Sequence, residues 1–374
     1  MNEYICITIL QHFGNLTDPR QPGKVLYPLI EVLFVALCAS LCGVNTFVDM
    51  ELFGNAKLEF LKKFLPFENG IPSHDTFGSV FANLDARQFN NIFKNWINSF
   101  LENIPEHIAI DGKTVKRSQY GDIPPVHIVS AYSTDKRLVL GQIKTDMKSN
   151  EITAIPKLLE MLSIAGSIIT IDAMGCQREI AQQIIDKKGD YLLAVKKNQE
   201  SLLNDIEITF KGVEDGTFST EIYQKVITEK DHGRIETRHY SIISDPLIIN
   251  YINGWPKLHT IGKVVRTCEN SDKITEDIRY FICSKEININ EFSKTVRSHW
   301  GIENSLHWVL DIVFREDDSR ARKKNAAANF VTLKHITLNM LKNLDGKHSI
   351  RARRVWASWD DSYLYKALCA ISIA

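Results

Sequence analysis

The chain lacks several features that would place it in a specialised class of protein. Its 374 residues carry no formal net charge, because 45 basic side chains balance 45 acidic ones, so total charge neither favours nor excludes a polyanionic partner. Its seven cysteines are scattered and form no CxxC pair, which gives no sign of a disulfide framework or a zinc site. No internal repeat or low-complexity segment stands out. These absences predict a reduced, cytoplasmic globular protein with a sizeable core.

The sequence also has little that predicts secretion or a membrane. Its N-terminus shows no basic region followed by a signal-like apolar core. The apolar stretch PLIEVLFVALCASLCGV carries Glu31 and is shorter than the roughly 20 residues that a transmembrane helix needs. We interpret this stretch as a buried helix and expect no membrane partner.

Residues 1–105 are predicted to form a helical N-terminal domain. The segment DARQFNNIFKNWINSFLENI repeats large apolar residues on one helical face. The segment IPSHDTFGSVFANL offers Ser73 or Asp75 as a helix start.

The pattern changes at Ile108, and residues 106–214 predict the first part of an α/β core. Three short apolar runs, HIAIDGK, PVHIVSAYS and RLVLGQIKT, predict an antiparallel meander. A helix, the buried strand SIITIDA, a second helix and the strand DYLLAVK follow. This order of elements is that of a ribonuclease H-like catalytic core.

The remaining chain divides into two further segments. Residues 215–290 alternate with a period of two and predict a β-rich insertion that leaves the core as a subdomain. Helical spacing restarts in NEFSKTVRSHWGIENSLHWVLDIVF. Residues 291–374 are therefore expected to form the C-terminal helical part of the core.

Three acids stand out because each is presented by an element that looks buried on its other side. Asp111 ends the apolar run of HIAIDGK, Asp172 ends that of SIITIDA, and Glu303 lies in the last helical segment. A carboxylate in such a place costs desolvation free energy unless a positive group compensates it. Oxygen ligands favour Mg²⁺, or Mn²⁺, over zinc. In a two-metal site for phosphodiester chemistry, Asp111 would bridge both ions, and the other two acids would each complete one coordination sphere.

Each acid also has a purely structural explanation. Asp111 precedes a glycine and suits a turn, Asp172 suits a strand-end cap, and Glu303 suits an exposed helix carboxylate. Glu303, His307 and Asp311 are spaced by four and would lie near one another on a helix, a pattern compatible with a separate metal site. No second histidine has the spacing of a zinc protease motif.

The basic residues are unevenly distributed along the chain. Between Arg297 and Arg354 twelve lysines and arginines stand against six acids, a local excess of six that a phosphate backbone would favour. A solvated helix surface explains the same excess. The candidate DNA contacts lie beside the first and third acids or in this basic run, and they are Lys113, Lys116, Arg117, Arg297, His299, Trp300, Arg320 and Arg322. A solvated turn for the first three, and a core position for Trp300 and Trp308, are the alternatives.

Motifs across nearly the whole chain resemble those of DDE-type insertion-sequence transposases, in the group of H-repeat-associated proteins. The most specific are TIDAMGCQ and RSHWGIENSLHWVLDIVFREDDSRARKKNAAANF, and IAIDGKTVKRS and YLLAVKKNQ accompany them. The resemblance implies a ribonuclease H-like core and a catalytic triad of Asp111, Asp172 and Glu303. It also implies Mg²⁺-dependent cleavage and transfer of double-stranded DNA at transposon ends, with a homodimer expected in the DNA complex.

The sequence departs from the family pattern around the third acid. Many related transposases carry tyrosine, arginine and lysine there, spaced Y-x2-R-x3-E-x6-K, where this chain has Val296, His299 and Leu310. Arg297 and His299 are candidates for the missing DNA contacts. Two other functions stay open, namely a catalytically inert DNA-binding remnant of a transposase and a cellular ribonuclease H-like nuclease. Terminal inverted repeats in the flanking DNA would distinguish an insertion-sequence transposase from both.

Overall fold

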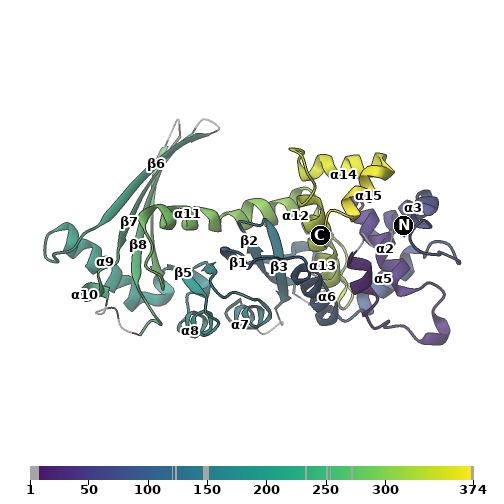
Figure 1. Cartoon of the computed structure of the whole chain (residues 1–374), viewed down its shortest axis with the longest axis horizontal. Helices are drawn as coiled ribbons and strands as arrows, with labels where there is room; N and C mark the ends of the chain where they lie inside the picture. Colours follow the sequence, from purple (N-terminus) through teal and green to yellow (C-terminus); the bar gives the residue numbers. More distant parts are fainter. Residues whose placement is uncertain are drawn as a thin grey trace.

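The computed structural model describes residues 8–119, 121–122, 124–145, 151–231, 234–249, 252, 254–270 and 273–371. Over these residues the molecule is elongated (Figure 1). Helices gather at one end, a mixed sheet runs through the middle, and long strands project at the other end.

The N-terminal region is helical, as its apolar spacing predicts. Its helices are α1 (Thr8–Phe13), α2 (Leu29–Leu41), α3 (Phe47–Ala56), α4 (Leu58–Leu61), α5 (His74–Asn83) and α6 (Ala86–Asn98). Ser73 occupies the residue before α5, and the Asp85 side chain caps α6 by accepting the backbone N–H groups of Arg87 and Gln88. Helix α2 is buried around almost its whole circumference, as a core helix should be. No helix in the described ranges has the length and apolarity to cross a bilayer.

The inner half of the sheet has the predicted element order. Its elements are β1 (His107–Thr114), β2 (His127–Ser133), β3 (Leu138–Lys144), α7 (Glu151–Met161), β4 (Ile168–Ile171), α8 (Arg178–Asp186) and β5 (Asp190–Val195). Strands β1, β2 and β3 are antiparallel neighbours, while β4 lies parallel to both β1 and β5. The spatial order β3-β2-β1-β4-β5 is the ribonuclease H-like arrangement.

The outer half of the sheet corrects one prediction. Its elements are α9 (Glu200–Glu214), β6 (Tyr223–Asp231), β7 (Arg234–Ile243), α10 (Pro246–Ile249), β8 (Thr260–Asn270) and β9 (Lys273–Cys283). The strands are present as predicted, but β9 pairs with β5, so that β6–β9 extend the core sheet to nine strands. The prediction of a β-rich subdomain that leaves the core is therefore wrong. The period of two identifies the strands and their faces but not the edge with which they pair. In the structure the apolar end of β9, Phe281 to Cys283, covers the edge of β5 that would otherwise be open.

The chain then returns along the sheet to the helical end. The returning elements are α11 (Ile289–His299), the π-helical turn η6 (Glu303–His307), α12 (Trp308–Ile312), α13 (Ala326–Lys342), α14 (Ile350–Trp359) and α15 (Asp361–Leu368). Short 3-10 turns connect several elements, and they are η2 (Pro22–Lys24), η3 (Lys116–Ser118), η4 (Ala173–Gly175), η5 (Lys197–Gln199) and η7 (Glu316–Asp318). Figure 1 shows α11 running lengthwise over the strands toward α12.

Helix α13 joins the two halves of the protein. It is almost entirely buried and contacts α2, α5 and α6 on one side and β3 on the other. One hydrophobic cluster accordingly includes residues of the N-terminal helices and of the inner strands. The proposed boundaries near residues 105, 214 and 290 stay predictions, because the packing is continuous across the first of them.

Candidate metal centre and nucleic-acid interface

The first two acids lie at corresponding positions of neighbouring parallel strands. Ile110 pairs with Ile171, Asp111 is the next residue of β1, and Asp172 directly follows β4. Strand β1 continues through Gly112 to Thr114 in register with β2, so the alternative that Asp111 is a turn residue is wrong. Asp172 does act as a cap, since its Oδ1 accepts the backbone N–H groups that open η4. Its cap role and its position beside Asp111 are compatible.

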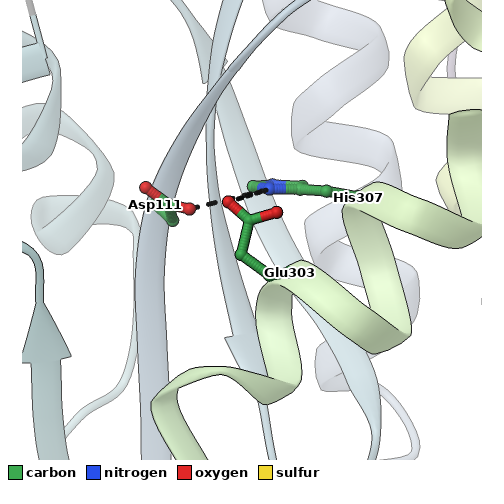
Figure 2. A group of neighbouring side chains, drawn as sticks. All are labelled: Asp111, Glu303 and His307. Atoms are coloured by element: carbon green, nitrogen blue, oxygen red, sulfur yellow. Dashed lines mark ion pairs between the residues drawn. The ribbon is translucent and has the colours of Figure 1, made fainter. Parts of the chain in front are cut away.

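The third acid reaches the first from the returning helical segment. Figure 2 shows Glu303 and His307 projecting from η6 toward Asp111 on β1. His307 Nδ1 lies 3.6 Å from Asp111 Oδ2 and 3.5 Å from Glu303 Oε1. One ligand atom from each of the three residues lies within 4.8 Å of the others, a spacing suited to a shared metal ion. Exposure decreases from Glu303 (49%) to Asp111 (16%) and His307 (6%), so the cluster opens to solvent on the Glu303 side.

Burial makes the two strand acids difficult to ionise. It raises the pKa of Asp111 to about 7, against the opposing attraction of the His307 imidazole. Burial also raises the pKa of Asp172, and the neighbouring Glu151 carboxylate adds to that effect. The contact with His307 lowers the pKa of Glu303. The carboxylates of Asp111 and Glu303 are close enough to share a divalent ion, and the burial of the strand acids is unfavourable without a cation. The residues present therefore fit a divalent ion held by carboxylates.

A glycine beside the first acid admits a polar pair from two other elements. A Cβ atom on Gly112 would lie 2.2 Å from Glu151 Oε1 and 2.5 Å from His127 Nε2. These two groups are 2.8 Å apart, and His127 Nδ1 lies 2.8 Å from Thr114 Oγ1. Sequence reasoning missed Glu151, a fourth acid near the site.

The basic residues after Asp111 differ in their accessibility. Lys113 is 10% exposed, and its ammonium group contacts Asp311 at 2.7 Å and Glu316 at 3.0 Å. The expectation that Lys113 binds a DNA phosphate is a poor fit to this enclosed position, because acids distant in sequence already compensate its charge. Lys116 and Arg117 are 76% and 58% exposed and pair with acids of η7 at the surface.

The candidate DNA contacts beside Glu303 also differ in their accessibility. His299 Nδ1 lies 2.9 Å from Thr170 Oγ1, and burial lowers the pKa of His299 to about 4, so a neutral imidazole links α11 to β4. Arg297 is at the surface, 3.3 Å from Glu229 of β6. Trp300 and Trp308 are 40% and 57% exposed, which contradicts the alternative that they are core tryptophans. The Arg279 guanidinium lies 5.1 Å from the centre of the Trp300 ring.

A basic groove lies between the N-terminal helices and the segment after α12. Its volume is about 1510 Å³. Its lining has five arginine and lysine side chains and three aspartates, an excess of two positive charges. The basic ones are Arg117, Arg315, Arg320, Arg322 and Lys323, and the aspartates are Asp49, Asp75 and Asp318. Phe47 and Val48 of α3 and Gly78 and Ser79 of α5 line it from the other side. Arg322 is held to Arg117 because its Nε donates to the Arg117 carbonyl at 2.8 Å.

Part of the basic excess seen in the sequence is internal. Lys334, Arg353 and Arg354 are buried, and the two arginines donate to backbone carbonyl groups. These three therefore do not contribute to a surface for DNA.

Two family models and several relatives match this chain. The model of the "DDE_Tnp_1-associated" family matches residues 10–97, and that of the "Transposase DDE domain" family matches residues 102–340. The chain is 40% identical to "Putative transposase YncI" of Escherichia coli O157:H7, over 98% of this chain and 95% of that protein. It is 38% identical to "H repeat-associated putative transposase YhhI" of Escherichia coli K12, over 98% and 99% of the two chains.

The chain belongs to the DDE transposase family, in the group of H repeat-associated proteins, and its core is ribonuclease H-like. A solved structure of "piggyBac transposase synaptic complex with hairpin DNA" aligns with a TM-score of 0.46 and 10% identity, covering 97% of this chain and 80% of that one.

Proposed function

We propose that this chain is an active transposase that cleaves and joins DNA strands at the ends of its own insertion sequence. The observation that carries the proposal is the convergence of Asp111 and Glu303, from elements nearly 200 residues apart, beside the strand that ends at Asp172. The family relationship supplies the reaction class, and this geometry supplies a site for it.

The three acids have distinct places in the proposed site. Asp111 gathers with Glu303 and His307, and its strand lies beside the strand that Asp172 follows. Asp111 would therefore take the role shared between the two other acids. Divalent ions, Mg²⁺ or Mn²⁺, would stabilise charge on the phosphodiester and activate the attacking water or 3′-hydroxyl. The cap at Asp172 and the η6 turn at Glu303 fix the directions of these two carboxylates, and half-buried His299 holds α11 against β4.

Double-stranded DNA is the proposed partner, and it would lie along the basic groove and the exposed face near Glu303. Lys116, Arg117, Arg320 and Arg322 are positioned to contact phosphates, because their side chains line or adjoin the groove. Arg297 and Trp300 would contact DNA nearer the acids. We propose a homodimer in the DNA complex and a cytoplasmic location on the basis of the family resemblance.

An inert remnant is the second candidate function. "Inactive transposase YbfQ" of Escherichia coli K12 is 40% identical over 72 residues, 19% of this chain. The present chain matches two putative transposases over 98% of its residues and has all three acids, which favours activity. A cellular nuclease on the same fold is the third candidate, and inverted repeats flanking the gene would argue against it.

The test is cleavage of a duplex that carries the DNA flanking this gene, in the presence of Mg²⁺. We expect Asp111→Ala, Asp172→Ala and Glu303→Ala each to abolish cleavage while binding of the duplex largely survives, because the acids hold metal and not DNA. Glu59→Ala, at a side chain 90% exposed and far from the site in sequence, is the matched control and is expected to cleave normally. A variant that retains the wild-type rate would remove its acid from the triad.

His299→Ala and Arg297→Ala extend the same assay. Both are expected to lower cleavage more than binding, because they position α11 and the DNA beside the acids. A proportional loss of binding and cleavage would show that they act only as DNA contacts.

A further inference from the structure

We propose that His307 is a nitrogen ligand of the divalent ion at Asp111 and Glu303, and that it makes this site favour Mn²⁺ over Mg²⁺. The inference rests on the proposed function, because it concerns a ligand of the same centre. It adds a residue outside the three acids and a preference between two metals.

The distances suit a shared ion better than a direct bond. Ligand atoms about 2.1 Å from an octahedral ion lie about 3.0 Å apart when adjacent and about 4.2 Å apart when opposite. His307 Nδ1 stands 3.6 Å from Asp111 Oδ2 and 3.5 Å from Glu303 Oε1, between these two values. A charge-assisted hydrogen bond would bring the atoms to about 2.7–2.9 Å.

Glu303 and His307 both face Asp111, and the π-helical turn between them favours this alignment slightly more than an α-helix would. In η6 the Trp308 N–H donates to the Glu303 carbonyl, five residues back instead of four. This wider turn brings residues four apart closer to alignment along the helix axis than an α-helix does. The two side chains consequently project together toward β1 (Figure 2).

The turn is held in place by a lysine from the buried helix α13. Lys342 Nζ donates to the Ser305 carbonyl within η6 at 2.8 Å and to the Tyr132 hydroxyl of β2 at 2.9 Å. The turn is thereby attached to both α13 and the sheet. His307 is 6% exposed, so its ring has little freedom to turn away from the acids.

The metal preference follows from ligand chemistry. Mg²⁺ is bound mainly by oxygen, whereas an imidazole nitrogen favours transition metals. Replacing His307 with asparagine is expected to weaken Mn²⁺ binding by about tenfold or more. Mg²⁺ binding is expected to change less, so that the ratio of the two affinities falls.

The test is pulsed electron paramagnetic resonance of Mn²⁺ bound to the full-length chain, with metal affinities measured by calorimetry. Wild type is expected to show ¹⁴N coupling from a directly bound imidazole. His307→Asn and His307→Gln are expected to lose it, while His239→Asn, at an exposed position of β7, retains it. Labelling histidine with ¹⁵N should replace the ¹⁴N signal and assign the coupling to that residue type.

The outcomes distinguish this inference from the proposed function. Bound Mn²⁺ without ¹⁴N coupling in wild type, or coupling that persists in both His307 variants, overturns the nitrogen ligand and leaves the acids in place. An unchanged Mn²⁺-to-Mg²⁺ affinity ratio in His307→Asn overturns the preference. Metal binding that is unaffected by Asp111→Ala overturns the proposed centre itself.

Discussion

The inner and outer halves of the sheet differ in how their buried carboxylates are compensated by positive charge. In the outer half, Glu236 of β7 is 7% exposed, and Arg266 Nε lies 2.6 Å from its Oε1. This arginine lowers the pKa of Glu236. In the inner half, burial raises the pKa of Asp111, and the nearest cationic candidate is the His307 imidazole at 3.6 Å.

The difference separates structural acids from acids suited to a metal. Glu236 has its compensating charge within the fold, from Arg266 and Arg238, and is complete without a ligand. Across the described part of the chain, no arginine forms an ion pair with Asp111 or Asp172, and the attraction of Lys196 does not offset the burial that raises the pKa of Asp172. A cation from outside would therefore stabilise both acids. Lys113 and its three acids follow the outer pattern although they lie close to the inner site.

The largest expected effect comes from Glu236→Gln, which removes the carboxylate that the arginines of the outer half compensate. This change removes the buried carboxylate that Arg234, Arg238 and Arg266 share, and among the described residues only Arg238 keeps another ion-pair partner, Glu229. We expect the free energy of unfolding at pH 7 to fall by roughly 2–4 kcal/mol. Because the folded pKa is lowered, the stabilisation is present above the unfolded pKa of about 4.3 and is lost as pH falls through the folded value. Urea unfolding at pH 7 and pH 3 measures it, with Glu59→Gln as control. Equal stability of variant and wild type at pH 7 would contradict the structural role.

The second prediction concerns the stability that a divalent ion adds through the acids of the inner half. A divalent ion at 100 times its Kd is expected to stabilise the wild type by about 2.7 kcal/mol. Asp111→Ala should lose this response, while Glu236→Gln should keep it, because only the inner acids bind metal. Thermal unfolding with Mg²⁺ or Mn²⁺ against a chelator measures the response. An equal response in Asp111→Ala would place the metal elsewhere.

Gly112→Ala tests the close packing of Glu151 and His127 against the strand that carries Asp111. Its new methyl group would meet Glu151 and His127 at 2.2 and 2.5 Å, so one side chain must move at a cost of about 1–3 kcal/mol. Cleavage should fall as well, because the displaced groups adjoin the two strand acids. Gly23→Ala is the control, since no atom lies within 4 Å of its added Cβ. Unchanged stability and cleavage in Gly112→Ala would refute the close approach.

The smallest expected effect concerns the groove. Neutralising Arg320 and Arg322 together should weaken binding of end DNA. It should also reduce the slope of log affinity against log salt by up to about 0.9 for each phosphate that the variant no longer neutralises. Neutralising exposed Lys347 and Lys366, outside the groove lining, is the control. A salt titration with the same slope and affinity in both double variants would mean that DNA lies elsewhere.

Local sequence patterns predict the strands and the positions of two acids at or directly after them. Asp111 and Asp172 each end an apolar run, and a buried parallel strand needs such a run, so both the strands and the strand ends are recognisable. The outer strands are also predicted from their alternation. Their attachment to β5 is not, because the apolar inner end of β9 does not specify which edge it pairs with.

Contacts between segments that are distant in sequence could not be predicted from local patterns. Lys113 looks like a surface base in sequence, and only the folded chain brings it to Asp311 and Glu316. Glu303 and His307 are recognisable in the sequence from their α-helical spacing. The π-helical turn and its hydrogen bond from Lys342 of another helix are not. Trp300 and Trp308 resemble core residues because side-chain type alone does not distinguish a core ring from an exposed one.

The most direct test of the central claim, that the inner acids gather metal and the outer acids do not, is an anomalous difference map from crystals soaked in Mn²⁺. The account predicts density between Asp111, Glu303 and Asp172, with a second ion about 3.5–4 Å from the first once DNA is bound. It predicts none at Glu236. A map without density at the inner acids, or with Mn²⁺ beside Glu236 instead, would contradict it.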